Sequence, residues 1–317
     1  MNSKKVLIIG CGNIAGKYNN HPDSSKSLTH AKAILQNPNL ELYGCVDNDK
    51  ENLKSFSKKW NIPRIYNSID EVKNKNQIDI ITIASPTDLH FEHLRNSLNL
   101  NPRVVFLEKP ASIELTEINK LKDLNLKNNI AVNYLRAWDE KLHEMKGFIH
   151  SKESKILNIH AICSGDILNY GSHMIHCLQM LFGELKIENI FSDGLHQKNV
   201  VFSSDYKNMI NVIFNNSFNS YSVFEINFFL EDKIITMRNN GLVWESRSIT
   251  SDKHFKNLKY GNVNAKFESG GLLEALDNAY KNIIENIDKK ATLNCTLDNA
   301  LDAEVICHKI ISYRNKK

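Results

Sequence analysis

The chain has no hydrophobic run long enough to cross a membrane. None of its apolar stretches approaches the roughly 18 residues that a spanning helix requires. Lys4 and Lys5 precede an apolar run at residues 6–9, but this run is too short to be the hydrophobic region of a secretory signal. These absences predict no membrane partner and a cytoplasmic location.

Cysteine pairs and basic clusters are also missing. The six cysteines form no CxxC pair, so we expect reduced, buried thiols rather than disulfides or a cysteine-rich zinc site. The net charge of +4 is small, and other residues interrupt the lysine runs, which argues against a nucleic-acid partner. No internal repeat or low-complexity linker is present.

What is present is the composition of a globular protein, with 42% hydrophobic and 24% charged residues. A length of 317 residues exceeds the usual size of a single hydrophobic core. We therefore predict two domains, at residues 1–130 and 131–317.

The first domain alternates short apolar runs with amphipathic segments, which predicts a doubly wound parallel sheet of the Rossmann type. The expected strands are residues 6–9, 42–46, 78–84, 104–107 and 130–132. The expected helices are residues 29–35, 49–60, 68–75, 87–98 and 112–127.

The second domain changes to period-two alternation, which predicts an open antiparallel sheet with one buried face and an α+β fold. Apolar residues alternate at Ile210, Val212 and Phe214, and the same period continues through residues 224–228. Two amphipathic helices end the chain, and we expect the last, at residues 296–315, to pack back toward the Rossmann domain.

A glycine-rich turn follows the first strand. Gly10, Gly12 and Ala15 have the G-x-G-x-x-A spacing of a dinucleotide-binding turn, and the amides of the helix start, at Asn13 and Ile14, would bind phosphate. The alternative is a purely structural turn. A strand before the turn and a helix after it favour cofactor binding.

Asp47 ends the second strand, where a carboxylate accepts hydrogen bonds from both ribose hydroxyls and repels a 2′-phosphate. This arrangement favours NAD over NADP, although Lys50 is near. The alternative is a surface aspartate that caps the next helix. Residues 17–28 have the composition of a loop and lengthen the interval between the glycine turn and Asp47. We expect an insertion there, either a solvated loop or one that lies over the cofactor or the substrate.

Lys109 follows the apolar run 104–107 and so lies where open α/β sheets bind ligands. Pro110 restricts the lysine to extended geometry or imposes a cis bond. On its own, a lysine at a strand end is more often solvated.

A histidine cluster lies in the second half. On a helix, Asn169 and His173 would share a face, and an oriented imidazole suits proton transfer. The alternative is a helix histidine whose partners are backbone groups. His176 and Cys177 are also candidate metal ligands. No further ligand has suitable spacing, so we expect no metal.

Together these motifs resemble the Gfo/Idh/MocA family of pyridine-nucleotide oxidoreductases, over nearly the whole length. The resemblance adds four segments to the glycine turn and Asp47: Ser85, Pro86, Thr87 and His90; Glu108, Lys109 and Pro110; Asn133 to Arg136; and Gly171, Ser172 and His173.

The resemblance implies a role for each motif. The cofactor-binding residues would be Gly10, Gly12, Asn13, Ile14, Asp47, Ser85, Pro86, Thr87, His90, Glu108 and Lys109. Lys109 and His173 would be the catalytic pair with Asn169, and the substrate-binding residues would be Lys109, Arg136, Asn169, Tyr170 and His173. The family also implies a homodimer or homotetramer built through the second sheet.

One position departs from the family, because Asn169 stands where a carboxylate is usual. A neutral amide orients an imidazole without raising its basicity, so His173 would be the weaker base. Asp166 lies three residues earlier and is a candidate replacement.

We therefore predict hydride transfer between NAD and a carbinol or ketone carbon of a sugar, sugar derivative or nucleotide sugar, with a role in surface-glycan biosynthesis. Two alternatives remain: an NAD-binding regulator without turnover, and a glycoside-cleaving enzyme that oxidises and re-reduces its sugar.

Overall fold

The structure, a computed structural model, describes residues 3–18, 25–73, 76–123, 129–151, 155–194, 196–206, 209–217 and 221–313. Residue contacts divide the chain into two units. Unit 1 comprises residues 1–138 and 273–304, and unit 2 comprises residues 139–272 and 305–317. The division falls eight residues after the predicted boundary, and the chain returns to unit 1 before it ends.

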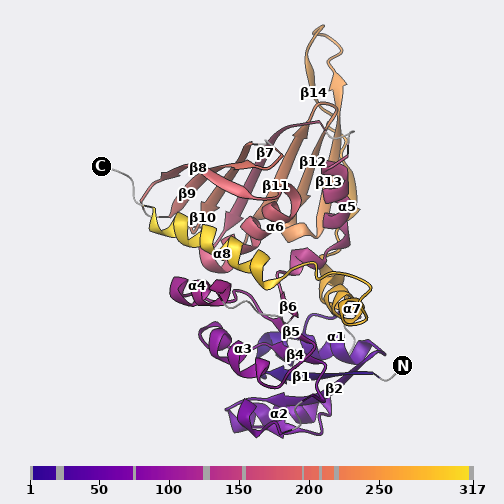
Figure 1. Ribbon diagram of the computed structural model, residues 1–317. Coiled ribbons are helices and arrows are strands. Elements are labelled where there is room, and N and C mark those ends of the chain that lie inside the picture. The colour runs from indigo at the N-terminus through magenta and orange to yellow at the C-terminus, as the bar shows by residue number, and fades with distance from the viewer. Residues whose placement is uncertain are drawn as a thin grey trace. The chain divides into compact units, whose positions relative to one another are not determined.

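Unit 1 contains a parallel sheet with the strand order β3-β2-β1-β4-β5-β6. Figure 1 labels five of its strands, β2, β1, β4, β5 and β6. The strands are β1 (Lys4–Ile9), β2 (Leu40–Val46), β3 (Ile65–Tyr66), β4 (Ile80–Ile83), β5 (Val104–Leu107) and β6 (Asn129–Val132). Strand order reverses between β1 and β4, and ligands bind at such a switch point in doubly wound sheets. The predicted Rossmann fold is confirmed.

The helices of unit 1 begin close to their predicted starts. They are α1 (His30–Gln36), α2 (Lys50–Trp60), α3 (His90–Leu98), α4 (Leu115–Asp123) and α7 (Ala275–Ile287). Asp49 caps α2, since its side chain accepts hydrogen bonds from the amides of Glu51 and Asn52.

The prediction of a helix at residues 68–75 is wrong over its described part. A 3-10 turn, Ile69–Glu71, replaces the helix, and Val72 is extended. The Glu71 carboxylate accepts a hydrogen bond from the amide of Asn67, which closes a local turn in place of a further helical one. Residues 74–75 of that prediction, 124–127 of the helix after Ser112 and 19–24 of the insertion lie outside the described residues.

Unit 2 contains a larger sheet with the order β14-β13-β12-β11-β7-β10-β9-β8, and β15 pairs with β13. Its strands are β7 (Ile156–Ser164), β8 (Leu185–Ser192), β9 (Gln197–Ser204), β10 (Met209–Asn215), β11 (Phe224–Leu230), β12 (Lys233–Arg238), β13 (Val243–Ser251), β14 (Lys259–Gly261) and β15 (Lys266–Ser269). Its helices are α5 (Glu140–Ile149) and α6 (Ser172–Phe182).

This sheet is mixed rather than purely antiparallel, because β10 runs parallel to β7. Helix α6 carries the chain from β7 to β8, and the antiparallel run β8-β9-β10 then ends on a strand with the direction of β7. The predicted alternation is confirmed in β10 and β11, where every second residue is buried. The rings of Phe182 on α6 and Phe228 on β11 lie 6.3 Å apart, so α6 packs on the buried face of the sheet.

The last helix, α8 (Leu297–Ser312), has residues in both units, with the portion up to Glu304 in unit 1. The segment before it returns to the edge of the parallel sheet, where Ala131 of β6 forms an antiparallel bridge with Thr296. All six cysteines are buried and none forms a disulfide, as predicted. Within the described ranges, no helix is long and apolar enough to span a bilayer.

Candidate active site

The glycine turn follows β1 and requires glycine for two different reasons. Gly10 has φ of +90°, and a Cβ there would lie 2.5 Å from the amide nitrogen of Ser85. At Gly12 a Cβ would meet nothing within 4 Å, so the backbone is open to a ligand. A π-helical turn, Asn13–Lys17, follows the glycines and leaves its first amides at this opening.

Asp47 at the end of β2 is tied to the glycine turn. One carboxylate oxygen, Oδ2, accepts a hydrogen bond from the Cys11 amide at 2.8 Å, and Oδ1 accepts one from the Asp49 amide at 2.9 Å. Because Asp49 rather than Asp47 caps α2, the helix-capping interpretation of Asp47 is wrong. Asp47 instead positions the end of β2 against the turn where a ribose would lie.

A pocket of about 190 Å³ lies at this edge of the sheet. Four residues predicted to bind the cofactor line it: Gly10, Asp47, Ser85 and Pro86. Other lining residues were not predicted to bind the cofactor: Asn67, Ser68, Asp70, Glu92, His93 and Asn96. The open glycine backbone, the carboxylate and the adjoining pocket fit a dinucleotide cofactor.

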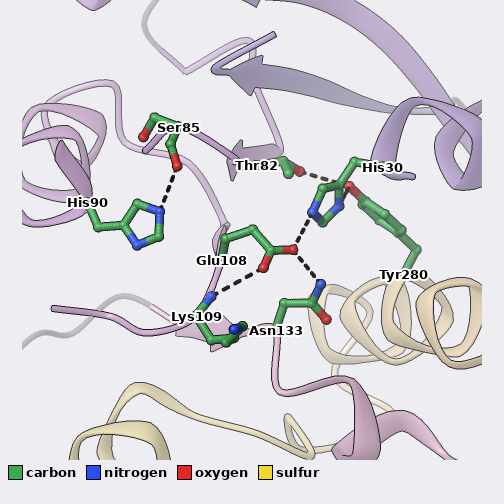
Figure 2. Close-up of polar contacts among 8 residues, drawn as sticks. All are labelled: His30, Thr82, Ser85, His90, Glu108, Lys109, Asn133 and Tyr280. Carbon is green, nitrogen blue, oxygen red and sulfur yellow. Dashed lines mark hydrogen bonds and ion pairs between the residues drawn. The ribbon is translucent and has the colours of Figure 1, made fainter. Parts of the chain in front are cut away.

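Thr87 and His90 do not line this pocket. Thr87 begins a short 3-10 turn, and His90 is buried as the first residue of α3. His90 Nδ1 lies 2.7 Å from the carbonyl oxygen of Pro110. His90 Nε2 lies 3.0 Å from the carbonyl oxygen of Ser85, the contact that Figure 2 shows. His90 therefore connects the turn after β4 to the turn after β5.

Glu108 is the centre of a buried hydrogen-bond network (Figure 2). Its Oε1 atom lies 2.9 Å from His30 Nε2 and accepts a hydrogen bond of 2.6 Å from Asn133 Nδ2. The other nitrogen of His30 lies 3.0 Å from the Tyr280 hydroxyl, which is 2.9 Å from Thr82 Oγ1. The network joins β4, β5, α1 and α7 beneath the carboxyl edge of the sheet.

This network keeps Glu108 ionised. Burial raises the pKa of the Glu108 carboxyl, but the His30 hydrogen bond and charge, Asn133 and the Lys109 charge outweigh it and lower that pKa overall. The amide of Lys109 also donates to Glu108 Oε2 at 3.3 Å. The carboxylate thus holds the backbone that presents Lys109.

Lys109 itself is half-buried and begins a cis peptide bond to Pro110. Burial is the main cause that lowers the pKa of Lys109, and the positive charge of Arg136 lowers it further. The negative charges of Glu108 and Glu304 act in the opposite direction but do not outweigh the burial. Arg136, predicted to bind substrate, is buried in the 3-10 turn Leu135–Trp138 that follows β6. A lysine with a lowered pKa at a ligand-binding edge suits proton exchange and oxyanion stabilisation.

The histidine segment of unit 2 is not one continuous α-helix, so that part of the prediction is wrong. A π-helical turn, Ile167–Gly171, contains Asn169, and α6 begins at Ser172 just before His173. Asp166 caps the π-helical turn, because its carboxylate accepts a hydrogen bond from the Asn169 amide at 2.9 Å. The segment therefore begins with a capped π-helical turn, and the α-helix starts only at Ser172.

In the same segment His173 is half-buried, while Asn169 and Tyr170 are exposed. His176 is buried, and burial lowers its pKa to about 4, so it is a neutral core residue at physiological pH. Over the part of the chain that the structure describes, no three His, Cys, Asp or Glu residues gather as metal ligands.

Unit 1 therefore brings the predicted cofactor residues and Lys109 to one sheet edge, and unit 2 holds Asn169, Tyr170 and His173. That Lys109 and His173 act as a pair stays a prediction. Sequence reasoning missed His30, Tyr280 and Glu304. A signal existed for Glu304, which lies seven residues after Leu297 and three after Leu301, on the apolar face of the last helix.

Residues 4–135 match a family of known proteins described as "Oxidoreductase family, NAD-binding Rossmann fold", the GFO_IDH_MocA family. A curated relative, glucose-6-phosphate 3-dehydrogenase of Bacillus subtilis (strain 168), is 30% identical over 135 residues. That match covers 41% of this chain and 34% of the relative. The chain therefore matches about a third of the length of this curated relative.

Solved structures show the same fold over nearly the whole chain. A putative NADPH-dependent oxidoreductase from Desulfitobacterium hafniense has a TM-score of 0.78 at 15% identity, covering 99% of this chain and 97% of that chain. A 3-ketoreductase from Actinomadura kijaniata, in complex with TDP-benzene and NADP, has a TM-score of 0.74 at 12% identity, covering 98% of each chain. The predicted fold class, a parallel Rossmann sheet with a second, mostly antiparallel sheet, is confirmed.

Proposed function

We propose that the chain is an NAD-dependent enzyme that oxidises a sugar carbinol or reduces the corresponding ketone, because its residues 4–135 match the Gfo/Idh/MocA family of oxidoreductases. One observation carries this proposal. Gly10, Asp47, Ser85 and Lys109 follow β1, β2, β4 and β5, so the cofactor residues and the lysine share the carboxyl edge of one parallel sheet.

The bound nicotinamide would accept or supply the hydride. Lys109 binds the reacting oxygen and stabilises the negative charge that develops on it. In the oxidation direction, His173 takes the proton of the substrate hydroxyl, and in reduction it returns that proton. Asn169 orients this site, and Tyr170 and Arg136 contact the substrate.

NAD is the preferred cofactor in this proposal. Three carboxylates, of Asp47, Asp70 and Glu92, line the pocket at the end of β2. A 2′-phosphate would place two further negative charges among them. This acidic lining supports NAD even though relatives of the same fold include NADP-bound and NADPH-dependent proteins.

The substrate class comes from the relatives. The curated relative is named a 3-dehydrogenase of glucose 6-phosphate, and the A. kijaniata structure is a 3-ketoreductase in complex with a TDP compound. We propose a phosphorylated or nucleotide-linked sugar that reacts at its third carbon, in the synthesis of a surface glycan.

We also propose a homo-oligomer through the second sheet. On its less buried face, Ile162 of β7 pairs with Ile213 of β10, and Phe229 of β11 lies on the same half-exposed side of its strand. Half-exposed apolar side chains on a broad sheet face favour self-association. Sedimentation-velocity centrifugation that finds only the monomer at all concentrations tested would reject this part.

A non-catalytic regulator is the second candidate, because Asn169 replaces the carboxylate expected before His173. Such a protein would bind NAD with no turnover. An internal-redox glycosidase would convert its sugar with no net change in NADH absorbance. A dehydrogenase changes NADH stoichiometrically with substrate, so the absorbance separates the three.

The test is a screen of sugar phosphates and nucleotide sugars with NAD, NADH, NADP and NADPH. Wild type, Lys109→Ala and His173→Ala are compared on each substrate that reacts. We expect both variants to lose at least about 100-fold in kcat. Equal turnover in all three proteins would reject the assigned pair, and cofactor binding without turnover on any substrate would favour the regulator.

A further inference from the structure

A buried carboxylate from α8 lies behind Lys109. Glu304 is fully buried in unit 1. Its Oε1 atom accepts hydrogen bonds from the Ala111 amide at 2.7 Å and from the Tyr134 hydroxyl at 3.1 Å. Its Oε2 atom accepts one from the Ser112 amide at 3.4 Å. Two of these three donors therefore belong to the backbone that directly follows Lys109 and Pro110.

The peptide group between Pro110 and Ala111 is held at both ends. Its carbonyl oxygen bonds Nδ1 of His90 on α3 at 2.7 Å, and its N–H donates to Glu304 on α8 at 2.7 Å. Buried hydrogen bonds to both ends of a peptide group restrict its orientation. Since this group directly follows the Lys109–Pro110 bond, its orientation sets the direction in which Lys109 leaves the strand.

We propose that Glu304 is a positioning residue for Lys109, which fixes the turn behind the lysine and acts through its charge on the lysine ammonium. This inference rests on the proposed function, because the role of Lys109 in the reaction is part of that proposal. Glu304 lies outside the family motifs and outside the matched residues 4–135.

The electrostatics of the surrounding groups agree with this role. The charges that act on Lys109 come from Glu108 on its own strand end, Arg136 after β6 and Glu304 on α8. Burial raises the pKa of Glu304 to about 8, against the lowering effects of its three donors and of Lys109. Two further titratable groups lie next to these carboxylates. His30 bonds Glu108. Cys295 lies near Glu304, and burial raises the pKa of its thiol. Above about pH 8, then, Glu304 is ionised and favours the protonated form of Lys109.

The first experiment measures the titration of Lys109 without any substrate. Lys109 is acetylated with acetic anhydride from about pH 6 to about pH 11, and peptide mass spectrometry gives its reactivity at each pH. We expect Glu304→Gln to move the midpoint to lower pH, because the ammonium loses an attractive charge. A midpoint equal to that of wild type would overturn the proposal.

Asp302→Asn is the matched control. Asp302 lies two residues before Glu304 on the same helix, and its carboxylate pairs with Lys122 at 2.6 Å in an exposed position. This substitution also removes one negative charge from α8, and we expect no change in the Lys109 midpoint. An equal shift in Asp302→Asn and Glu304→Gln would overturn the specific role of Glu304.

A second variant tests the same coupling from the other side, should Glu304→Gln fail to fold. Linkage requires that Lys109 acts on Glu304 as Glu304 acts on Lys109. Lys109→Met keeps the apolar stem of the half-buried side chain and removes its charge. We expect this substitution to raise the pKa of Glu304. The pKa is measured by NMR from the chemical shift of the Glu304 side-chain carboxyl in protein with 13C-labelled glutamate. An unchanged titration of Glu304 in Lys109→Met would overturn the coupling.

Turnover separates this inference from the proposed function. On a substrate found in the screen, we expect Glu304→Gln to lower kcat roughly 10- to 100-fold, with the KM for cofactor near that of wild type and the alkaline limb of the pH profile moved to lower pH. A full kcat with an unmoved alkaline limb would overturn the positioning role. If the acetylation midpoint moves and no sugar ever reacts, the proposed function fails while the coupling stands.

Discussion

His30 and Glu108 form a buried contact between imidazole and carboxylate, with 2.9 Å between His30 Nε2 and Glu108 Oε1. They are 78 residues apart in the chain, one on α1 and the other just after β5. Through this contact α1, which carries none of the recognised motifs, holds Glu108, the residue directly before Lys109. The Glu108 side chain is thus held by the interior of unit 1.

This contact predicts a large loss of stability for His30→Ala. Removal of the imidazole leaves the Glu108 carboxylate buried with less compensation, which costs about 3–5 kcal/mol when one partner of a buried pair is lost. The free energy of unfolding is measured by urea denaturation. Lys122→Ala, which removes a partly exposed ion pair with Asp302, serves as the control and should cost about 1 kcal/mol or less. A loss in His30→Ala no greater than in this control would contradict the structural role of the pair.

The raised pKa of Glu304 predicts the sign of a pH dependence. The folded value of about 8 exceeds the ordinary value of 4.5, so the folded state binds the proton more tightly. The resulting stability is complete below about pH 4.5 and is lost as the pH rises toward about 8. The free energy of unfolding of wild type relative to Glu304→Gln should therefore fall over this range, by up to about 1.4 kcal/mol per pH unit.

This prediction is checked by urea denaturation at a series of pH values for wild type, Glu304→Gln and Asp302→Asn. The difference between wild type and Asp302→Asn should show no comparable slope, because that carboxylate is exposed. A difference between wild type and Glu304→Gln that rises with pH would mean that Glu304 is instead a strongly stabilised carboxylate.

The two glycines of the turn should respond differently to alanine. Gly10→Ala places a Cβ 2.5 Å from the Ser85 amide at a positive φ, so it should destabilise unit 1 by more than about 1 kcal/mol. Gly12→Ala adds a Cβ in open space and should change the free energy of unfolding by less than about 0.5 kcal/mol.

Gly12→Ala should nevertheless weaken NADH binding by about tenfold or more, because a methyl group would block the close approach of the pyrophosphate. Denaturation curves and fluorescence titration of NADH measure the two effects separately. Wild-type NADH affinity in Gly12→Ala would remove this turn from the cofactor site.

Asp47→Ala should narrow the preference for NADH over NADPH. The substitution removes the carboxylate that would bind the ribose hydroxyls, so NADH affinity falls, and it removes one of the charges that would repel a 2′-phosphate. Dissociation constants for both cofactors, measured by isothermal titration calorimetry, give the ratio. Asp70→Asn tests whether the rest of the acidic lining contributes in the same direction. An unchanged ratio in Asp47→Ala would place the ribose elsewhere.

The sequence by itself determined the elements whose chemistry is local. Strand β5 occupies the run predicted from its apolar residues, Gly10 has the positive φ that the turn motif required, and Lys109 directly follows a strand end. Periodicity and the conformational range of glycine depend on neighbouring residues, so a single chain reveals them.

Two helices expected from spacing are replaced wholly or partly by short turns of another type. Asp166 bonds the Asn169 amide and begins a π-helical turn where the spacing predicted a continuous α-helix. A 3-10 turn, Ile69–Glu71, stands where a helix was predicted at residues 68–75, and the Glu71 carboxylate accepts a hydrogen bond from the Asn67 amide. Periodicity shows which residues share a face but does not distinguish an α-helix from a π-helical or 3-10 turn, so it could not predict these departures.

Only the tertiary structure decided which groups surround Lys109. His30 and Glu304 are 79 residues before it and 195 residues after it, and neither belongs to a motif. Their role depends on the burial of a carboxylate beside specific donors, and burial follows from the packing of α1, β5 and α8 rather than from the spacing of residues along the chain.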